Sequence, residues 1–160
     1  MSVVLNPSHA PVMHDEVIAG LEIKPKGRYV DGTYGRGGHA RSILAELDED
    51  GRLIVMDRDP QAIADARATF GCDDRVTIIH DDYANLKERI AGLDLLEEFD
   101  GILLDIGVSS PQLDDADRGF SFQHNGPLDM RMNPQQGESA AAWLQRADEG
   151  EIARVLWEYG

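Results

Sequence analysis

The stretch RYVDGTYGRGGHARSILAEL, Arg28–Leu47, places three local signals directly after one another. Its first four residues are apolar in the middle, which is typical of a short buried strand. A glycine-rich turn covers residues 32–38. Residues 39–47 then carry Ile43, Leu44 and Leu47 at the spacing of an amphipathic helix. Strand, glycine turn and helix in this order predict the first unit of a parallel α/β sheet.

The chain continues this alternation up to about residue 106. A short helix over 12–21 precedes the first strand, and two further helices are predicted, one from Asp59-Pro60 to about Phe70 and one around 85–96. Asp59 suits the N-cap and Pro60 the first turn. Further strands are predicted at Arg52–Asp57, Arg75–His80 and Gly101–Ile106. Apolar strands separated by helices predict an open, doubly wound α/β fold with about four parallel strands.

A polar residue lies at or just after the end of each predicted strand. These residues are Asp31 before the glycine turn, Asp57, His80 with Tyr83 nearby, and Asp105. In doubly wound sheets, ligands bind beyond the carboxyl ends of the strands. We therefore expect a ligand site at this edge.

The chain after Asp105 has a different character. ILLDIGVSSPQLDDADRGFSFQHNGPLDMRM, Ile102–Met132, begins as a buried strand, and about 25 residues without a clean period follow. Residues 139–159 then favour helices. Four strands are half of a usual doubly wound sheet, so we expect the N-terminal part of a longer protein. The last strand would have an unpaired apolar edge, which favours self-association.

Composition narrows the function classes. The net charge is −15, from 15 basic and 30 acidic residues, and this total opposes a nucleic-acid partner. However, residues 24–41 hold five basic residues and one acid, a local charge of +4. No apolar run predicts a membrane span, and no signal peptide or metal-ligand spacing is present. The single cysteine, Cys72, fits a cytoplasmic location.

The glycine turn suits a nucleoside cofactor. Gly35, Gly37 and Gly38 allow close backbone approach, and the following helix offers free N–H groups. Asp57 lies twenty residues past Gly37, as expected for a carboxylate that binds ribose hydroxyls. The glycine order differs from the G-x-G-x-x-G of dinucleotide sites. The preceding Asp31 would repel a pyrophosphate but suits the cationic S-adenosylmethionine. The alternative is a plain strand-to-helix turn.

Two ring residues near these strand ends have two interpretations each. Tyr83 either stacks near an adenine or is a core tyrosine at a strand end. His39, at the start of the helix, is by itself more typical of a satisfied turn residue than of a ligand.

Four long motifs carry a resemblance that extends from His9 to the end of the chain. They are YVDGTYGRGGHA, MDRDPQAI, DGILLDIGVSSPQLDDADRGFSF and NGPLDMRM. In them the chain resembles the 16S rRNA (cytosine-N4)-methyltransferase family known as RsmH or MraW. The resemblance implies a Rossmann-like class I methyltransferase core. It also implies S-adenosylmethionine contacts at Gly37, Gly38, His39, Asp57, Tyr83, Asp105 and Gln112.

The resemblance also accounts for the long segment after Asp105. Residues 1–110 would be the N-terminal part of the methyltransferase domain, and residues 111–160 the connecting loop and the beginning of an inserted helical domain. Arg118–Met132 would bridge the two, and Gln112 would return toward the cofactor. Family enzymes are about twice as long as this chain.

The implied reaction is methylation of the exocyclic N4 of a cytidine in the decoding region of 16S rRNA, within the small ribosomal subunit. This amine is a poor nucleophile and must be positioned in line with the sulfonium methyl. Asp105 stands where other amino-methyltransferases begin an Asp/Asn/Ser-Pro-Pro-aromatic motif, but Asp-Ile-Gly-Val-Ser-Ser lacks the prolines and the aromatic residue. Asp105 is thus a candidate amine acceptor, and no residue is identified as a general base.

The hypothesis of an RNA substrate assigns roles to the basic residues of the segment 24–41, and two alternative functions remain. Lys26, Arg28, Arg36 and Arg41 are expected to flank the cofactor loop and position RNA, although Arg36 could instead pair with Asp57 or Asp59. One rival is a methyltransferase for a small molecule or a protein. The other is a non-catalytic rRNA-binding or assembly module.

Overall fold

The computed structural model describes residues 13–91 and 98–160. The chain divides into two compact units, with the boundary after Gly107. Each unit is described separately below.

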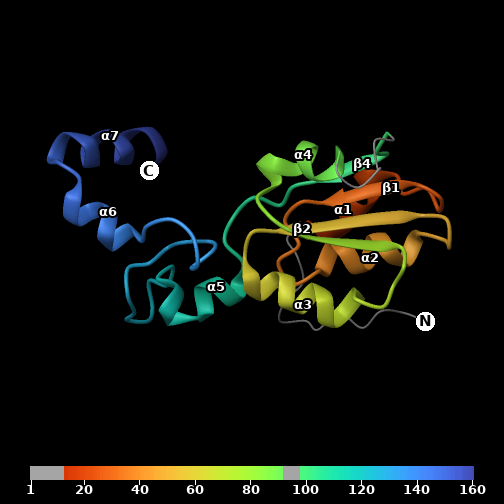
Figure 1. The fold of residues 1–160 in the computed structure, drawn as a ribbon, viewed down its shortest axis with the longest axis horizontal. Helices are drawn as coiled ribbons and strands as arrows, with labels where there is room; N and C mark the ends of the chain where they lie inside the picture. Colours follow the sequence, from red (N-terminus) through yellow and green to blue (C-terminus); the bar gives the residue numbers. More distant parts are fainter. Residues whose placement is uncertain (1–12, 92–97) are drawn as a thin grey trace. The chain divides into compact units, whose positions relative to one another are not determined.

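The first unit is built on a parallel sheet of four strands (Figure 1): β1 (Arg28–Asp31), β2 (Arg52–Asp57), β3 (Val76–His80) and β4 (Gly101–Leu103). The strand order is β3-β2-β1-β4. The chain moves outward from β1 to β3 and then crosses back to place β4 on the other side of β1. This reversal is the topological switch point at which doubly wound folds bind ligands. The predicted fold class is confirmed.

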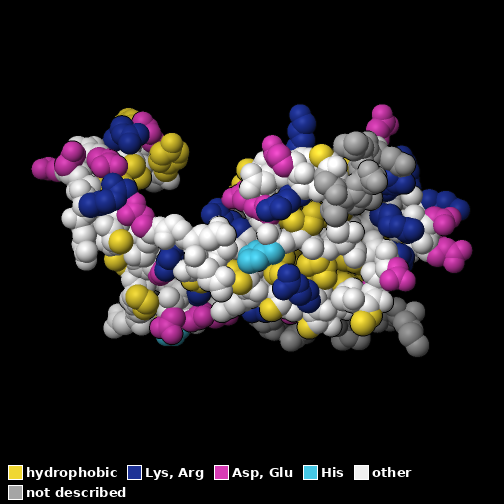
Figure 2. Space-filling model, viewed as in Figure 1, with side chains coloured by type: hydrophobic (Ala, Val, Ile, Leu, Met, Phe, Trp, Pro, Cys, Tyr) yellow, Lys and Arg dark blue, Asp and Glu magenta, His cyan; other side chains and the backbone are white. Residues whose placement is uncertain are grey.

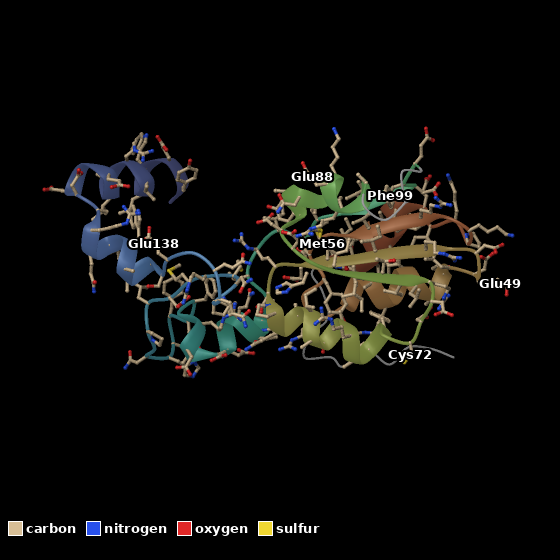
Figure 3. The ribbon with its side chains drawn as sticks, in the orientation of Figure 1. Glu49, Met56, Cys72, Glu88, Phe99 and Glu138 are labelled. Atoms are coloured by element: carbon tan, nitrogen blue, oxygen red, sulfur yellow. The ribbon has the colours of Figure 1, made fainter. Side chains whose placement is uncertain are left out.

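Helices cover both faces of this sheet. α1 (His14–Leu21), α2 (Gly38–Glu46) and α3 (Pro60–Phe70) pack with Tyr29, Leu53 and Val55 on one face. α4 (Leu86–Ala91) covers Val30, Ile54 and Met56 on the other, and Figure 3 shows Met56 and Phe99 on the α4 side. Full burial of such a side chain contributes up to about 1.5–3 kcal/mol, which makes these two clusters the main stabilising element.

Local sequence signals explain most of the element boundaries. Asp59 caps α3, because its Oδ1 accepts the N–H of Gln61 at 2.9 Å, and Pro60 opens the helix as predicted. The helix predicted over 85–96 is α4, preceded by the 3-10 turn η2 (Tyr83–Asn85). Its residues 92–97 lie outside the described part of the chain.

The fourth strand is shorter than predicted. β4 ends at Leu103, whereas the apolar run had predicted a strand to Ile106. The N–H of Asp105 donates to the Thr33 hydroxyl at 2.7 Å instead of to a neighbouring strand. Leu104 and Ile106 are 42% and 71% exposed. Side-chain hydrophobicity alone does not reveal this early departure from the sheet.

The second unit is helical. It contains α5 (Ser110–Asp114), the 3-10 turn η3 (Ala116–Arg118), α6 (Ala140–Arg146) and α7 (Glu149–Tyr159). The helices expected over 139–159 are confirmed as α6 and α7. The segment after Asp105, in which the sequence shows no clean period, contains α5 and η3, because α5 is started by a cap and not by apolar periodicity. Ser109 is the N-cap of α5, and the Oε1 of Gln112 accepts the Ser109 N–H at 2.9 Å.

A buried arginine organises the long loop of this unit. The Arg118 guanidinium donates to the carbonyl of Arg131 at 3.1 Å and to that of Met132 at 2.8 Å. The ends of the segment Arg118–Met132 are therefore tied together. Across residues 13–91 and 98–160, no helix is both long and apolar enough to cross a membrane.

Candidate cofactor site at the carboxyl edge of the sheet

The glycine loop after β1 is tightly fixed by its neighbours. Gly35 and Gly37 have φ of 55° and 69°, which L side chains rarely adopt. The Tyr34 hydroxyl donates to Asp65 of α3 at 2.7 Å. A Cβ on Gly37 would come within 2.6 Å of the Tyr34 ring, so any larger residue would require this ring to shift. The loop therefore has one defined path into α2.

α2 begins inside the predicted cofactor motif. Gly37 is its N-cap, and Gly38 and His39 open its first turn. The first N–H groups of a helix have no partner within the helix, and the helix dipole adds a partial positive charge there. This end of α2 can thus donate hydrogen bonds to a ligand.

Three carboxylates converge on the same edge. Asp31 is 1% exposed, and burial raises its pKa to about 7, with the nearby charges of Asp57 and Asp105 adding to the rise. The Thr33 N–H, 3.2 Å from Asp31 Oδ1, opposes this shift. Asp105 is the accessible member, with 54% of its side chain exposed. Such an edge favours a cationic ligand and disfavours a pyrophosphate.

Asp57 joins β2 to the glycine loop. Its Oδ2 accepts the Gly35 N–H at 2.8 Å, and its Oδ1 accepts the Asp59 N–H at 2.9 Å. Burial raises the pKa of Asp57, and these backbone bonds oppose the rise. Each carboxylate oxygen has a second lone pair, so the group can still accept ligand hydroxyls.

Tyr83 flanks the start of the glycine loop. It opens η2 just after β3, and its side chain is 38% exposed. A Cβ built on Gly32 would lie 3.4 Å from the Tyr83 Cβ and 2.6 Å from the Leu104 side chain. Gly32 therefore lies close to the Tyr83 Cβ and to the Leu104 side chain, so Tyr83 is next to the start of the glycine loop.

His39 is the least satisfied polar residue at this edge. It is 6% exposed, and its Nδ1 lies 4.0 Å from Asp105 Oδ2. Among residues 13–91 and 98–160, its Nε2 is the buried side-chain nitrogen or oxygen that lacks a hydrogen-bond partner. Burial lowers the pKa of His39, while Asp105 raises it. An unpaired buried group costs about 1–3 kcal/mol, a cost that often marks functional sites.

Comparison with known proteins gives the family. A family model described as the MraW methylase family matches residues 6–160. The chain belongs to the MraW methylase family.

Several solved structures are similar to this MraW family chain. A putative rRNA-methylase from Clostridium thermocellum is 24% identical over 55% of this chain and 48% of that chain, with a TM-score of 0.43. An rRNA methylase from Streptococcus thermophilus is 22% identical over 55% and 50%, with a TM-score of 0.38. An S-adenosylmethionine-dependent O-methyltransferase from Thermotoga maritima is 17% identical over 53% and 32%, with a TM-score of 0.42. The chain spans half or less of the length of these proteins.

The first unit of the MraW family chain brings six of the predicted site residues to one edge of the sheet: Gly37, Gly38, His39, Asp57, Tyr83 and Asp105. Gln112 belongs to the second unit, and its return toward the cofactor stays a prediction. Sequence reasoning missed Thr33, whose hydroxyl holds Asp105. A threonine in a glycine turn carries no signal for this role, because the partner is 72 residues away.

The expected role of the basic segment needs correction. Lys24 pairs with Asp100 and Lys26 with Asp50, each at 2.6 Å, and Arg28 begins β1. These residues lie at the amino ends of the strands, the edge marked by Glu49 in Figure 3, and not beside the cofactor loop. In a parallel sheet the amino ends of all strands lie on one side and the carboxyl ends on the opposite side. Residues before and after β1 therefore lie on opposite sides of the sheet.

Arg36 and Arg41 do lie at the glycine loop. Arg36 Nη1 is 3.7 Å from Asp65 Oδ1, so its partner is neither Asp57 nor Asp59. Arg41 donates to the Arg36 carbonyl at 2.8 Å. On the face shown in Figure 2, basic side chains are interspersed with acidic ones and do not form one patch.

Proposed function

We propose that the chain binds S-adenosylmethionine at the carboxyl edge of β1, β2 and β4 and methylates the exocyclic N4 of a cytidine in the decoding region of 16S rRNA. The observation that carries the proposal is the meeting of a glycine loop, a helix N-terminus and three carboxylates at the switch point of a methylase-family sheet.

The residues present fit this cofactor. Gly37, Gly38 and His39 would offer the first turn of α2. Asp57 would accept the ribose hydroxyls through its remaining lone pairs, and Tyr83 would stack near the adenine. Asp105, with Asp31 behind it, would face the cationic amino-acid part. Gln112 of the second unit would complete the set. NAD is disfavoured because its pyrophosphate would meet these carboxylates.

S-adenosylmethionine supplies an electrophilic methyl group on a sulfonium. The N4 amine is a weak nucleophile because its lone pair is delocalised into the base. The chain must hold this nitrogen in line with the methyl group and accept a hydrogen bond from the amine. The Asp105 carboxylate is accessible and its backbone is fixed by Thr33, so it suits both a cofactor contact and this acceptor role. We assign no general base.

The rRNA substrate rests on family membership and on the motifs quoted above. The cytidine must leave its stack or lie in a single-stranded loop to reach such an edge. Arg36 and Arg41, which lie at the glycine loop, would meet a phosphate there. An rRNA substrate in the small ribosomal subunit is consistent with a cytoplasmic protein.

Label transfer tests the proposal. The protein is incubated with labelled S-adenosylmethionine and assembled small ribosomal subunits that lack this methyl group. We expect the label in N4-methylcytidine after nuclease digestion, and a lower yield with Asp105→Asn. Label on protein or on a small metabolite, with none on rRNA, would show that the acceptor is wrong. Binding of S-adenosylhomocysteine and of subunits without transfer would favour the rRNA-binding or assembly module.

A further inference from the structure

His14 lies outside every motif discussed so far. It begins α1, with 19% of its side chain exposed, and its Nε2 lies 2.7 Å from the Ser42 hydroxyl of α2. Its Nδ1 lies 3.0 Å from Asp15 Oδ1. The Asp15 side chain is 99% exposed, so this second contact contributes little. The Ser42 bond therefore fixes the His14 ring to the helix that follows the glycine loop.

The His14 ring stacks on His39. The two imidazoles are parallel within 9°, and their centroids are 5.7 Å apart, in the range of offset ring stacking. His39 in turn lies beside Asp105 and has the unpartnered Nε2. A continuous path of contacts thus leads from Ser42 through both rings to the carboxylate edge.

We propose that His14 is a positioning residue of the cofactor site, whose ring holds the buried His39 imidazole beside Asp105. The proposal rests on the proposed function, because His39 lines the edge assigned to S-adenosylmethionine. It adds a residue from α1 that touches no cofactor itself.

The charges around the two rings determine the direction in which His14 changes the pKa of His39. His14 faces Asp15 and Ser42, and His39 faces Asp105 and His14. Burial lowers the pKa of His39 first, Asp105 raises it, and His14 lowers it further. A cationic His39 would repel the ammonium of the cofactor. Neutral His39 is therefore the binding form, and His14 extends the pH range over which it stays neutral.

A titration without ligand tests the contact. Ring nitrogen and proton shifts of His39 are followed by NMR against pH in the wild type and in His14→Phe. Phenylalanine keeps a flat ring on His39 but carries no charge. We expect the His39 midpoint to move to higher pH in His14→Phe, and no shift in His124→Phe, a control in the second unit. An unchanged or lower midpoint in His14→Phe would overturn the proposal.

Calorimetry with S-adenosylhomocysteine tests the consequence for binding. At about pH 8 we expect His14→Phe, which keeps a flat ring on His39 but loses the Ser42 bond, to lose less affinity than His14→Ala. His14→Ala should bind about threefold to tenfold more weakly, from loss of the stack. On acidification, His14→Phe should lose affinity at a higher pH than the wild type.

The two possible failures can be told apart. Wild-type affinity in His14→Ala at every pH, with an unchanged urea midpoint, would show that His14 positions nothing. No binding by the wild type would defeat the proposed cofactor itself, and the titration would still decide the contact between the rings.

Discussion

The backbone N–H of Gly35 donates to Asp57 Oδ2 at 2.8 Å, so the residue proposed to bind the ribose also holds the glycine loop in place. One carboxylate thus links the end of β2 to the path of the loop into α2. A change at Asp57 should affect the shape of the site as well as its ligand contacts.

The first prediction follows from this double role. Asp57→Ala should weaken S-adenosylhomocysteine binding by roughly 1–3 kcal/mol, because it removes charged hydrogen bonds. Asp57→Asn should lose less, because its amide oxygen can still accept the Gly35 N–H. Calorimetry measures both, with Asp50→Asn at the opposite edge as control. Tight NAD binding and none of S-adenosylhomocysteine would contradict the assignment.

The second prediction separates two effects of a side chain in the glycine loop: backbone strain at a positive φ and steric clash with the Tyr34 ring. Gly37→Ala should destabilise the chain by about 1–2 kcal/mol from the positive φ and by more from the Tyr34 ring. Gly35→Ala has the same sign of φ, but its Cβ would meet nothing closer than 3.9 Å, so it reports the strain alone. Urea titration gives both free energies of unfolding. Equal losses would mean that the Tyr34 ring moves aside freely.

The third prediction concerns Asp31 and pH. Its pKa is raised from 3.8 to about 7 in the folded chain, so between these values the folded state binds more protons than the unfolded state. This group's contribution to stability is therefore lost as pH rises. Asp31→Asn should be more stable than the wild type at about pH 8, by on the order of 4 kcal/mol. It should match the wild type near pH 4. Urea titrations at several pH values measure the difference, and a constant difference would contradict the buried acid.

The fourth prediction compares basic residues at the carboxyl ends of the strands with basic residues at the amino ends. Arg36→Ala/Arg41→Ala should lower methyl transfer to small subunits by roughly threefold to tenfold at low salt, and the deficit should shrink as salt weakens the phosphate contacts of the wild type. Lys24→Ala/Lys26→Ala, at the amino edge, should leave transfer unchanged. A loss confined to the lysine variant would place the RNA on the opposite side of the sheet.

The fifth prediction concerns β4, an outer strand of the sheet. In the described part of the chain β4 pairs with β1 alone, and Ile102 on it is 52% exposed. The chain should self-associate through this strand, and Ile102→Lys should make it monomeric, because an edge lysine opposes strand pairing. Light scattering reports the mass. If Leu156→Lys, on the exposed side of α7, disperses the protein and Ile102→Lys does not, the interface lies on the second unit instead.

The sequence by itself determined the first three strands, the glycine turn, the Asp59 cap and the carboxylates that follow the strands. These features depend on apolar periodicity and turn chemistry, which act over a few neighbouring residues. The strand-end argument placed Asp31, Asp57, Tyr83 and Asp105 together, because the carboxyl ends of parallel strands meet on one side of the sheet, and the family resemblance added Gly37, Gly38 and His39.

The tertiary structure alone decided where the basic residues go, how deeply Asp31 is buried, and which residues meet across elements. Asp65 as the partner of Arg36 and the stack of His14 on His39 join different helices. Lys24 and Arg36, close in sequence, lie on opposite edges because β1 runs through the sheet between them. Such pairings depend on strand order and on how the helices pack over the sheet. The sequence on either side of a residue therefore does not predict them.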